Sequence, residues 1–203
     1  MYAPPAFTRP EPFAIPPANA HKAGLASGSG RIIADIASET QARSNWCWAA
    51  VGMTLSRFLG TARTQADVAT RWYSPSPPGN DVQSLWAVVQ KVFGVSLEKL
   101  RSDDLKDMEA ARVRIATSID SGRPVAVNLL WDAGGGHFVC IFGYDRLADS
   151  HAFWIFDPTG LDSNSSNREL RLLSEMTRYP EPTGTAGRFG RWAEALLIPA
   201  SAG

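Results

Sequence analysis

The chain has 203 residues, in which 20 Lys and Arg balance 20 Asp and Glu, and 44% of the residues are hydrophobic. This length fits one domain plus a tail, and the absence of net charge and of basic runs argues against nucleic-acid or membrane-surface binding. Two cysteines are too few for a disulfide scaffold, and no apolar run approaches the roughly 20 residues of a membrane span. We therefore interpret both cysteines as free thiols.

Residues 1–30 are rich in Pro, Ala, Gly and Ser and show no periodicity. This composition predicts a disordered or extended leader, followed by one domain over 31–203. Six prolines by position 17 interrupt the apolar stretch that a Sec signal needs. Export by a route that uses an unstructured N-terminus stays open.

Apolar periodicity and capping residues predict a helical first half for this domain. The expected elements are a helix over 45–59 capped by Ser44 and ended by Gly60, a helix from Thr64 to Trp72, a loop over 74–80, a helix from Asn80 or Asp81 to Gly94, a strand near 95–100, and an amphipathic helix from Ser102 to Gly122.

The second half of the domain is rich in β-branched and aromatic residues, which predicts antiparallel strands. The strands are expected at 124–131, 137–145 and 152–158, with an ambiguous element at 168–177 and a last strand in RFGRWAEALLIP. Because helices come first and antiparallel strands second, the predicted class is α+β.

Cys47 lies where the first helix is expected to begin, six residues after Gln41. The positive end of a helix dipole favours the thiolate form of a cysteine at that position. A glutamine amide on the preceding loop can donate a hydrogen bond to a developing oxyanion. The pair therefore indicates acyl transfer by a cysteine nucleophile, although a single buried cysteine is more often a small apolar core residue.

Among three histidines, His137 is the candidate base for this nucleophile. It opens an apolar strand directly after Gly135 and Gly136, which permit a close approach of substrate. His21 lies in the leader and His151 in a polar turn, so both are expected to be surface residues.

An aspartate is expected to orient the His137 imidazole, since a carboxylate that accepts the ring N–H fixes the tautomer. Asp157 ends the next strand and would return to the neighbourhood of His137 in an antiparallel hairpin. Asp132 and Asp145 are competitors that resemble turn residues. We prefer Asp157.

Cys140 and the two tryptophans beside Cys47 are the remaining candidates. Cys140 lies three residues after His137, so strand alternation places it on the opposite face, in the core. The candidate residues contain no close ligand pair, which argues against a metal site. Trp46 and Trp48 flank the nucleophile, and we expect one to pack into the core and the other to line the substrate groove.

Together these residues resemble the papain-like cysteine peptidases of clan CA. The similarity covers roughly 40–160 and includes the Gln41-x5-Cys47-Trp48 spacing, GGHFVCIFGYD and WIFDPTG. The SNWCWAA context is similar to the avirulence-type peptidases that plant-associated bacteria inject into host cells. Asp replaces the Asn of papain itself, and FGRW at 189–192 resembles the self-cleavage strings of that branch, although strand packing or chance is the preferred interpretation.

The resemblance implies a papain-like fold and a cysteine endopeptidase that needs no cofactor or metal. Cys47 would be the nucleophile, His137 the general base and acid, Asp157 its orienting partner and Gln41 an oxyanion donor. The expected partner is a protein or peptide, not nucleic acid or membrane, and we expect a monomer. A bacterial effector secreted without a Sec signal into host cytoplasm, with a host activating factor, is the implied setting; otherwise the protein would be cytoplasmic.

Two alternatives stay open at this point. The same residues could perform another acyl transfer, as in a transglutaminase, a deamidase or a cell-wall amidase. An inactive papain-like domain that binds a partner is the second alternative, and the apparently intact set of catalytic residues argues against it.

Overall fold

The computed structural model describes residues 30–33, 36–61, 63–101, 108–132, 134–147, 150–159, 168–172, 179–180 and 189–200. The expected leader over 1–30 lies outside the described residues, apart from Gly30. The elements are β1 (Arg31–Ile32), α1 (Cys47–Ser56), α2 (Gln65–Tyr73), α3 (Leu85–Phe93), β2 (Glu98–Arg101), α4 (Met108–Asp120), β3 (Val125–Trp131), β4 (Gly136–Leu147), β5 (Ser150–Phe156), β6 (Arg168–Leu172), β7 (Tyr179–Pro180) and β8 (Phe189–Leu197).

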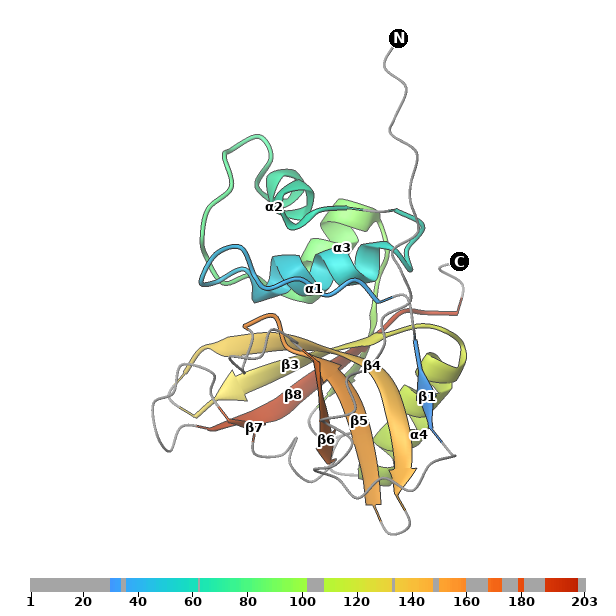
Figure 1. Ribbon diagram of the computed structural model, residues 1–203. Coiled ribbons are helices and arrows are strands. Elements are labelled where there is room, and N and C mark those ends of the chain that lie inside the picture. Colours follow the sequence, from blue (N-terminus) through green and yellow to red (C-terminus); the bar gives the residue numbers. More distant parts are fainter. Residues whose placement is uncertain are drawn as a thin grey trace.

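An antiparallel sheet with the order β2-β8-β3-β4-β5-β6 forms the centre of the fold. Helices α1, α2 and α3 form a layer on one side of this sheet, whereas α4 packs separately beside β1 and β4 (Figure 1). Most strands follow the helices in sequence, and α1, α2 and α3 form a layer separate from the antiparallel sheet, which confirms the predicted α+β class.

Alternate residues of the strands serve two separate cores. On β4, Cys140 and Phe142 pack with the residues of α1, α2 and α3. Their neighbours Val139 and Ile141 pack instead with Ile115 of α4. The sheet is thus buried on both faces, and this fixes the position of β4 relative to α1.

Helix α1 begins at Cys47, not at residue 45, and Trp46 occupies the N-cap position predicted for Ser44. Ser44 lies in a turn, where its hydroxyl accepts a hydrogen bond from Asn80 Nδ2 at 3.0 Å. That contact uses the oxygen that would have capped the helix. The consequence is that Cys47, rather than residue 45, is the first residue of α1.

Helix α2 is capped as predicted. The Thr64 hydroxyl accepts from the Asp67 backbone N–H at 3.1 Å, and the Asp67 carboxylate accepts from the Thr64 N–H at 3.0 Å. This reciprocal capping box stabilises the start of α2.

Helix α3 begins at Leu85, later than the predicted start at Asn80 or Asp81. The Asn80 side chain and the Asp81 carbonyl bind the segment around α1, so these residues do not join the helix. Gly94, with a φ of 72°, ends α3 as predicted.

The strands lie close to their predicted positions. Strands β3, β4 and β5 follow in antiparallel hairpin order, and the ambiguous element at 168–177 contains β6. Helix α4 is described only from Met108, because 102–107 lie outside the described residues. Within the part of the chain that the structure describes, no helix is both long and apolar enough to span a membrane.

Candidate active site

Cys47 occupies the N-terminus of a helix that is buried along its whole length. Trp46 precedes it, and its carbonyl accepts hydrogen bonds from the backbone N–H groups of Ala49 and Ala50, both at 2.9 Å. As the first residue of α1, Cys47 has a backbone N–H that no carbonyl within the helix accepts. The site thus offers a thiol and a backbone donor at the positive end of α1.

His137 lies near the start of β4, opposite Leu129 of β3. The imidazole is only 4% exposed and stacks on Trp131, with ring centroids 5.9 Å apart and an interplanar angle of 16°. A Cβ at position 190 would lie 2.4 Å from Trp131 Cε3, so the glycine leaves the space that the indole fills. Strand β8 thereby supports Trp131, which in turn supports His137.

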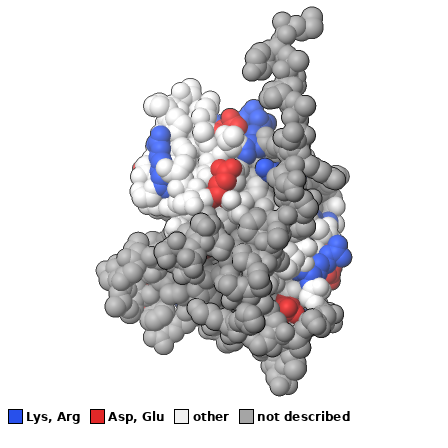
Figure 2. Space-filling model, in the orientation of Figure 1, with Lys and Arg blue, Asp and Glu red and all other residues white. Residues whose placement is uncertain are grey.

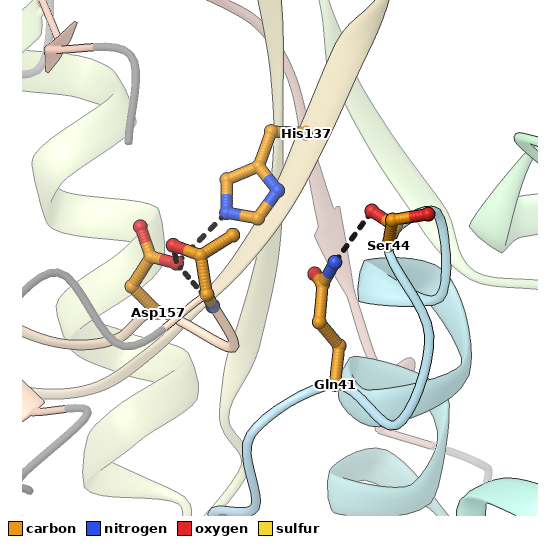
Figure 3. A network of polar contacts seen from close by, with 5 residues as sticks. Gln41, Ser44, His137 and Asp157 are labelled. Atoms are coloured by element: carbon orange, nitrogen blue, oxygen red, sulfur yellow. Dashed lines mark hydrogen bonds and ion pairs between the residues drawn. The ribbon is translucent and has the colours of Figure 1, made fainter. Parts of the chain in front are cut away.

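Asp157 follows β5 and binds the imidazole of His137 at Nε2. The distance from His137 Nε2 to Asp157 Oδ1 is 2.9 Å, and Asp157 is 1% exposed (Figure 3). The same carboxylate oxygen accepts from the Thr159 backbone N–H at 2.8 Å and from the Thr159 hydroxyl at 2.6 Å. Asp157 therefore has a fixed orientation, and Nδ1 is the ring nitrogen of His137 that stays available for Cys47.

Burial alone would lower the pKa of His137. The negative charge of Asp157, their hydrogen bond, and a hydrogen bond and charge interaction with Cys47 outweigh burial and raise that pKa to about 10. Burial would raise the pKa of Asp157, but His137 and the Thr159 hydrogen bonds lower it overall. The arrangement favours the imidazolium form of His137, which is the charged partner that a thiolate–imidazolium pair requires.

The structure places Gln41 on the loop before α1, with its side chain on the side where His137 lies (Figure 3). Its Nε2 donates to the Ser44 carbonyl oxygen at 2.6 Å. A primary amide has two N–H groups, so one donor stays available for an oxyanion. The Gln41 backbone N–H donates to the Pro158 carbonyl at 2.8 Å, which ties this loop to the segment that carries Asp157.

Trp46 and Trp48 are both buried and form contacts within the fold, and the expectation that one lines a substrate groove stays a prediction. Trp48 is completely buried and donates its indole N–H to the Asp81 carbonyl at 3.1 Å. The Trp46 indole N–H donates to the Gly79 carbonyl at 2.8 Å, and the Arg43 guanidinium covers its ring at 4.4 Å. Both indoles hold the 79–81 loop against α1, a role that spacing along the sequence does not reveal.

The glycines before His137 form the β3–β4 turn. Gly134 and Gly135 have φ values of 92° and 86°, and a Cβ at Gly136 would lie 2.9 Å from the Leu129 carbonyl oxygen. These conformations explain the glycines without a substrate. Substrate contact at Gly135 and Gly136 stays a prediction.

The other sequence candidates lie elsewhere. Cys140 is buried in the core, where desolvation raises the pKa of its thiol, and both cysteines are free. Asp132 is exposed and Asp145 lies on β4 opposite Ala152, whereas His151 lies on β5 opposite Arg146. His21 lies outside the described residues. Within the described part of the chain, no cluster of three or more His, Cys, Asp or Glu residues is suited to hold a metal ion.

Sequence reasoning missed Trp131 and Thr159, which orient His137 and Asp157. The Asp157-Pro158-Thr159 sequence contained a signal for the second, because an aspartate side chain commonly accepts from the backbone N–H two residues later. Trp131 carried no comparable signal, since its contact with Gly190 joins residues far apart in the chain.

A known protein with a solved structure has a similar fold. A SERA5E structure from Plasmodium falciparum is similar over 83% of this chain and 91% of that chain, with a TM-score of 0.58 and 11% identity, which shows a shared papain-like fold. Two structures are weaker matches. UfSP from C. elegans has a TM-score of 0.47 and 13% identity, over 86% of this chain and 35% of that chain. Procathepsin L 3 from Tenebrio molitor has a TM-score of 0.44 and 13% identity, over 84% of this chain and 71% of that chain.

No curated protein sequence matches significantly. The sequence model of the Peptidase_C39 like family matches residues 33–185, which include Gln41, Cys47, His137 and Asp157. This range covers most of the chain and agrees with the papain-like fold. The chain therefore belongs to the Peptidase_C39 like family and is a papain-like cysteine peptidase.

Proposed function

We propose that the protein is an endopeptidase that uses Cys47, His137 and Asp157 as a catalytic triad and Gln41 as an oxyanion donor. The observation that carries this proposal is the position of His137, which interacts with Cys47 and with Asp157 in a buried environment. Such a constellation activates a cysteine nucleophile and orients its base.

In the proposed mechanism, the Cys47 thiolate attacks the carbonyl carbon of a peptide bond. The negative oxygen that forms is stabilised by the second Gln41 amide N–H and by the backbone N–H of Cys47. His137 then gives a proton from Nδ1 to the leaving amine, and the C–N bond breaks. Finally His137 removes a proton from water, which attacks the thioester, and the S–C bond breaks to release the acid.

The test is a digest of a peptide library by the wild type, with Cys47→Ala as the inactive control. We expect new N-termini with the wild type only. Ligation of an added primary amine without new N-termini would show an acyl transferase and contradict the endopeptidase proposal. Cleavage by Cys47→Ala at the wild-type rate would contradict the proposed nucleophile.

We further propose that the protein acts on host proteins as a bacterial effector that leaves the cell without a Sec signal. The Pro-rich composition of 1–30 and the SNWCWAA context support this setting. On the face shown in Figure 2, the described Lys, Arg, Asp and Glu residues form small separate groups among uncharged ones.

The setting is tested by fractionating bacterial cultures that produce Cys47→Ala, which avoids toxicity. Protein in the medium that depends on residues 1–30 supports the proposal, and protein only within the cells contradicts it. Activity of the purified wild type on peptides that rises only on adding a host-cell extract would support a host activating factor, and full activity of the purified protein alone would argue against one.

A further inference from the structure

Gln65 is a buried polar side chain that the proposed mechanism does not use. It is the first residue of α2, is 5% exposed, and lies more than 20 residues away in sequence from the loop that it contacts. A buried amide must form hydrogen bonds to offset its desolvation. The partners of this amide therefore indicate what the residue does.

The two ends of the Gln65 amide bind the residues on either side of Gln41. Its Oε1 accepts from the Ala42 backbone N–H at 2.9 Å, and its Nε2 donates to the Thr40 carbonyl at 2.9 Å. A two-point contact of this kind fixes both the position and the rotation of the peptide that it brackets. Together with the bond from the Gln41 N–H to Pro158, it holds the segment 40–42 at three points.

The stability of α2 does not explain this contact. The Thr64–Asp67 capping box already satisfies the start of that helix. The Gln65 side chain points instead to the loop before α1, and Gln41 is the residue at the centre of the bracket. An oxyanion donor must be held in place before the reaction, because an error of about 1 Å in a reacting group can cost about 100-fold in rate.

We propose that Gln65 is a positioning residue that holds the Gln41 amide in the oxyanion site. The proposal rests on the proposed function, in which Gln41 is an oxyanion donor. Gln65 acts through the backbone of 40–42 and does not touch the substrate. Its loss should weaken steps that pass through an oxyanion and spare steps that need only the thiolate.

Two reagents separate these steps without knowledge of the natural substrate. With p-nitrophenyl acetate, the Cys47 thiolate forms an S–C bond through a tetrahedral oxyanion, and p-nitrophenolate leaves with the C–O electron pair. With iodoacetamide, the same thiolate displaces iodide directly, and no oxyanion forms. The ratio of the two second-order rate constants therefore reports the oxyanion site rather than general damage to the fold.

The variant Gln65→Met keeps the length of the side chain and removes the bonds to Ala42 and Thr40, together with a 3.5 Å bond from Nε2 to Glu39 Oε2. We expect about 10-fold slower acylation with unchanged alkylation, against about 100-fold slower acylation for Gln41→Ala. In the Gln41→Ala background, Gln65→Met should cost less than about twofold more, because a residue that acts through another loses its effect when that residue is absent.

The matched control is Asp67→Ala, which removes the capping box of the same helix and leaves the Gln65 contacts in place. It should lower the stability of the protein by about 1 kcal/mol and leave the ratio of acylation to alkylation unchanged. If Gln65→Met does not fold, Gln65→Glu retains the acceptor for Ala42 and places a carboxylate against the Thr40 carbonyl. We expect slower acylation there too.

Wild-type acylation by a folded Gln65 variant, or a fully additive effect with Gln41→Ala, would overturn the positioning role. An equal loss of alkylation and acylation would also overturn it. These results differ from a failure of the proposed function, which would appear as unchanged acylation in Gln41→Ala or in Cys47→Ala.

Discussion

Replacing Asp157 by Asn removes the charge of the carboxylate while keeping its shape. Thr159 donates two hydrogen bonds to Oδ1, so the amide oxygen of an asparagine would take that position and still accept from His137 Nε2. The tautomer of His137 is then preserved. The variant therefore isolates the charge of Asp157 from its role in orientation.

The size of the effect follows from the hydrogen bond that loses its charge. A hydrogen bond to a charged group contributes about 1.5–3 kcal/mol, and a neutral one about 0.5–1.5 kcal/mol. The difference, roughly 1–1.5 kcal/mol, lowers the pKa of His137 and corresponds to about one pH unit along its titration curve. Asp157→Ala removes the acceptor as well, and breaking a buried pair in this way costs about 3–5 kcal/mol.

The assay is an NMR titration of 15N-labelled imidazoles, which is tractable because the chain has three histidines. In the wild type, His137 should titrate far above the ordinary value of 6.5, near 10, and Asp157→Asn should move its curve to lower pH by about one pH unit. Asp132→Asn, which removes an exposed carboxylate, should move nothing. A His137 curve that is identical in the wild type and in Asp157→Asn would refute the reasoning.

Three further predictions follow from the same geometry. The raised pKa of His137 stabilises the folded protein fully below pH 6.5, and this stabilisation is lost as the pH rises through about 10. The lowered pKa of Asp157 stabilises the folded protein fully above pH 3.8, and this stabilisation is lost as the pH falls through the pKa of Asp157 in the folded protein. The difference in unfolding free energy between the wild type and Asp157→Asn, measured in urea, should be largest between pH 3.8 and 6.5, and a flat difference from pH 3 to 11 would contradict this. Gly190→Ala should force Trp131 from its place beside His137, cost about 1–3 kcal/mol of stability and slow acylation. Activity and stability equal to those of the wild type would contradict the role of β8 in supporting Trp131. Iodoacetamide should label Cys47 in the folded protein and Cys140 only after unfolding, because Cys140 is fully buried and the pKa of its thiol is raised. Peptide mass analysis measures the labelling, and labelling of Cys140 in the folded protein would contradict its place in the core.

The parts of the fold that local patterns determine could be predicted from the sequence. Thr64 begins α2 and Gly94 ends α3 where predicted, since caps and left-handed glycines depend on neighbouring residues. The start of α1 was placed wrongly, because the hydrogen bond between Ser44 and Asn80 joins residues 36 positions apart. Contacts at such a distance have no periodicity in the sequence.

In the candidate site too, some residues could be predicted from local sequence and others depend on long-range contacts. Cys47, His137 and Asp157 were selected by residue type and by their places at the ends of elements, and the structure brings His137 and Asp157 together. The expected groove role of Trp46 or Trp48 stays a prediction, because an aromatic residue beside a nucleophile carries no information about which side faces the core. The supports at Trp131, Thr159 and Gln65 depend on tertiary packing, which only the structure reveals.

The central claim is that Cys47 forms a covalent acyl intermediate, and one measurement tests it most directly. The protein is mixed with p-nitrophenyl acetate, quenched in acid within the first turnover and digested for peptide mass analysis. The account predicts one acetyl group on the peptide that contains Cys47, and none in Cys47→Ala. An acetyl group on another residue at the same rate, or no acetylated Cys47 peptide while p-nitrophenolate is released, would contradict it.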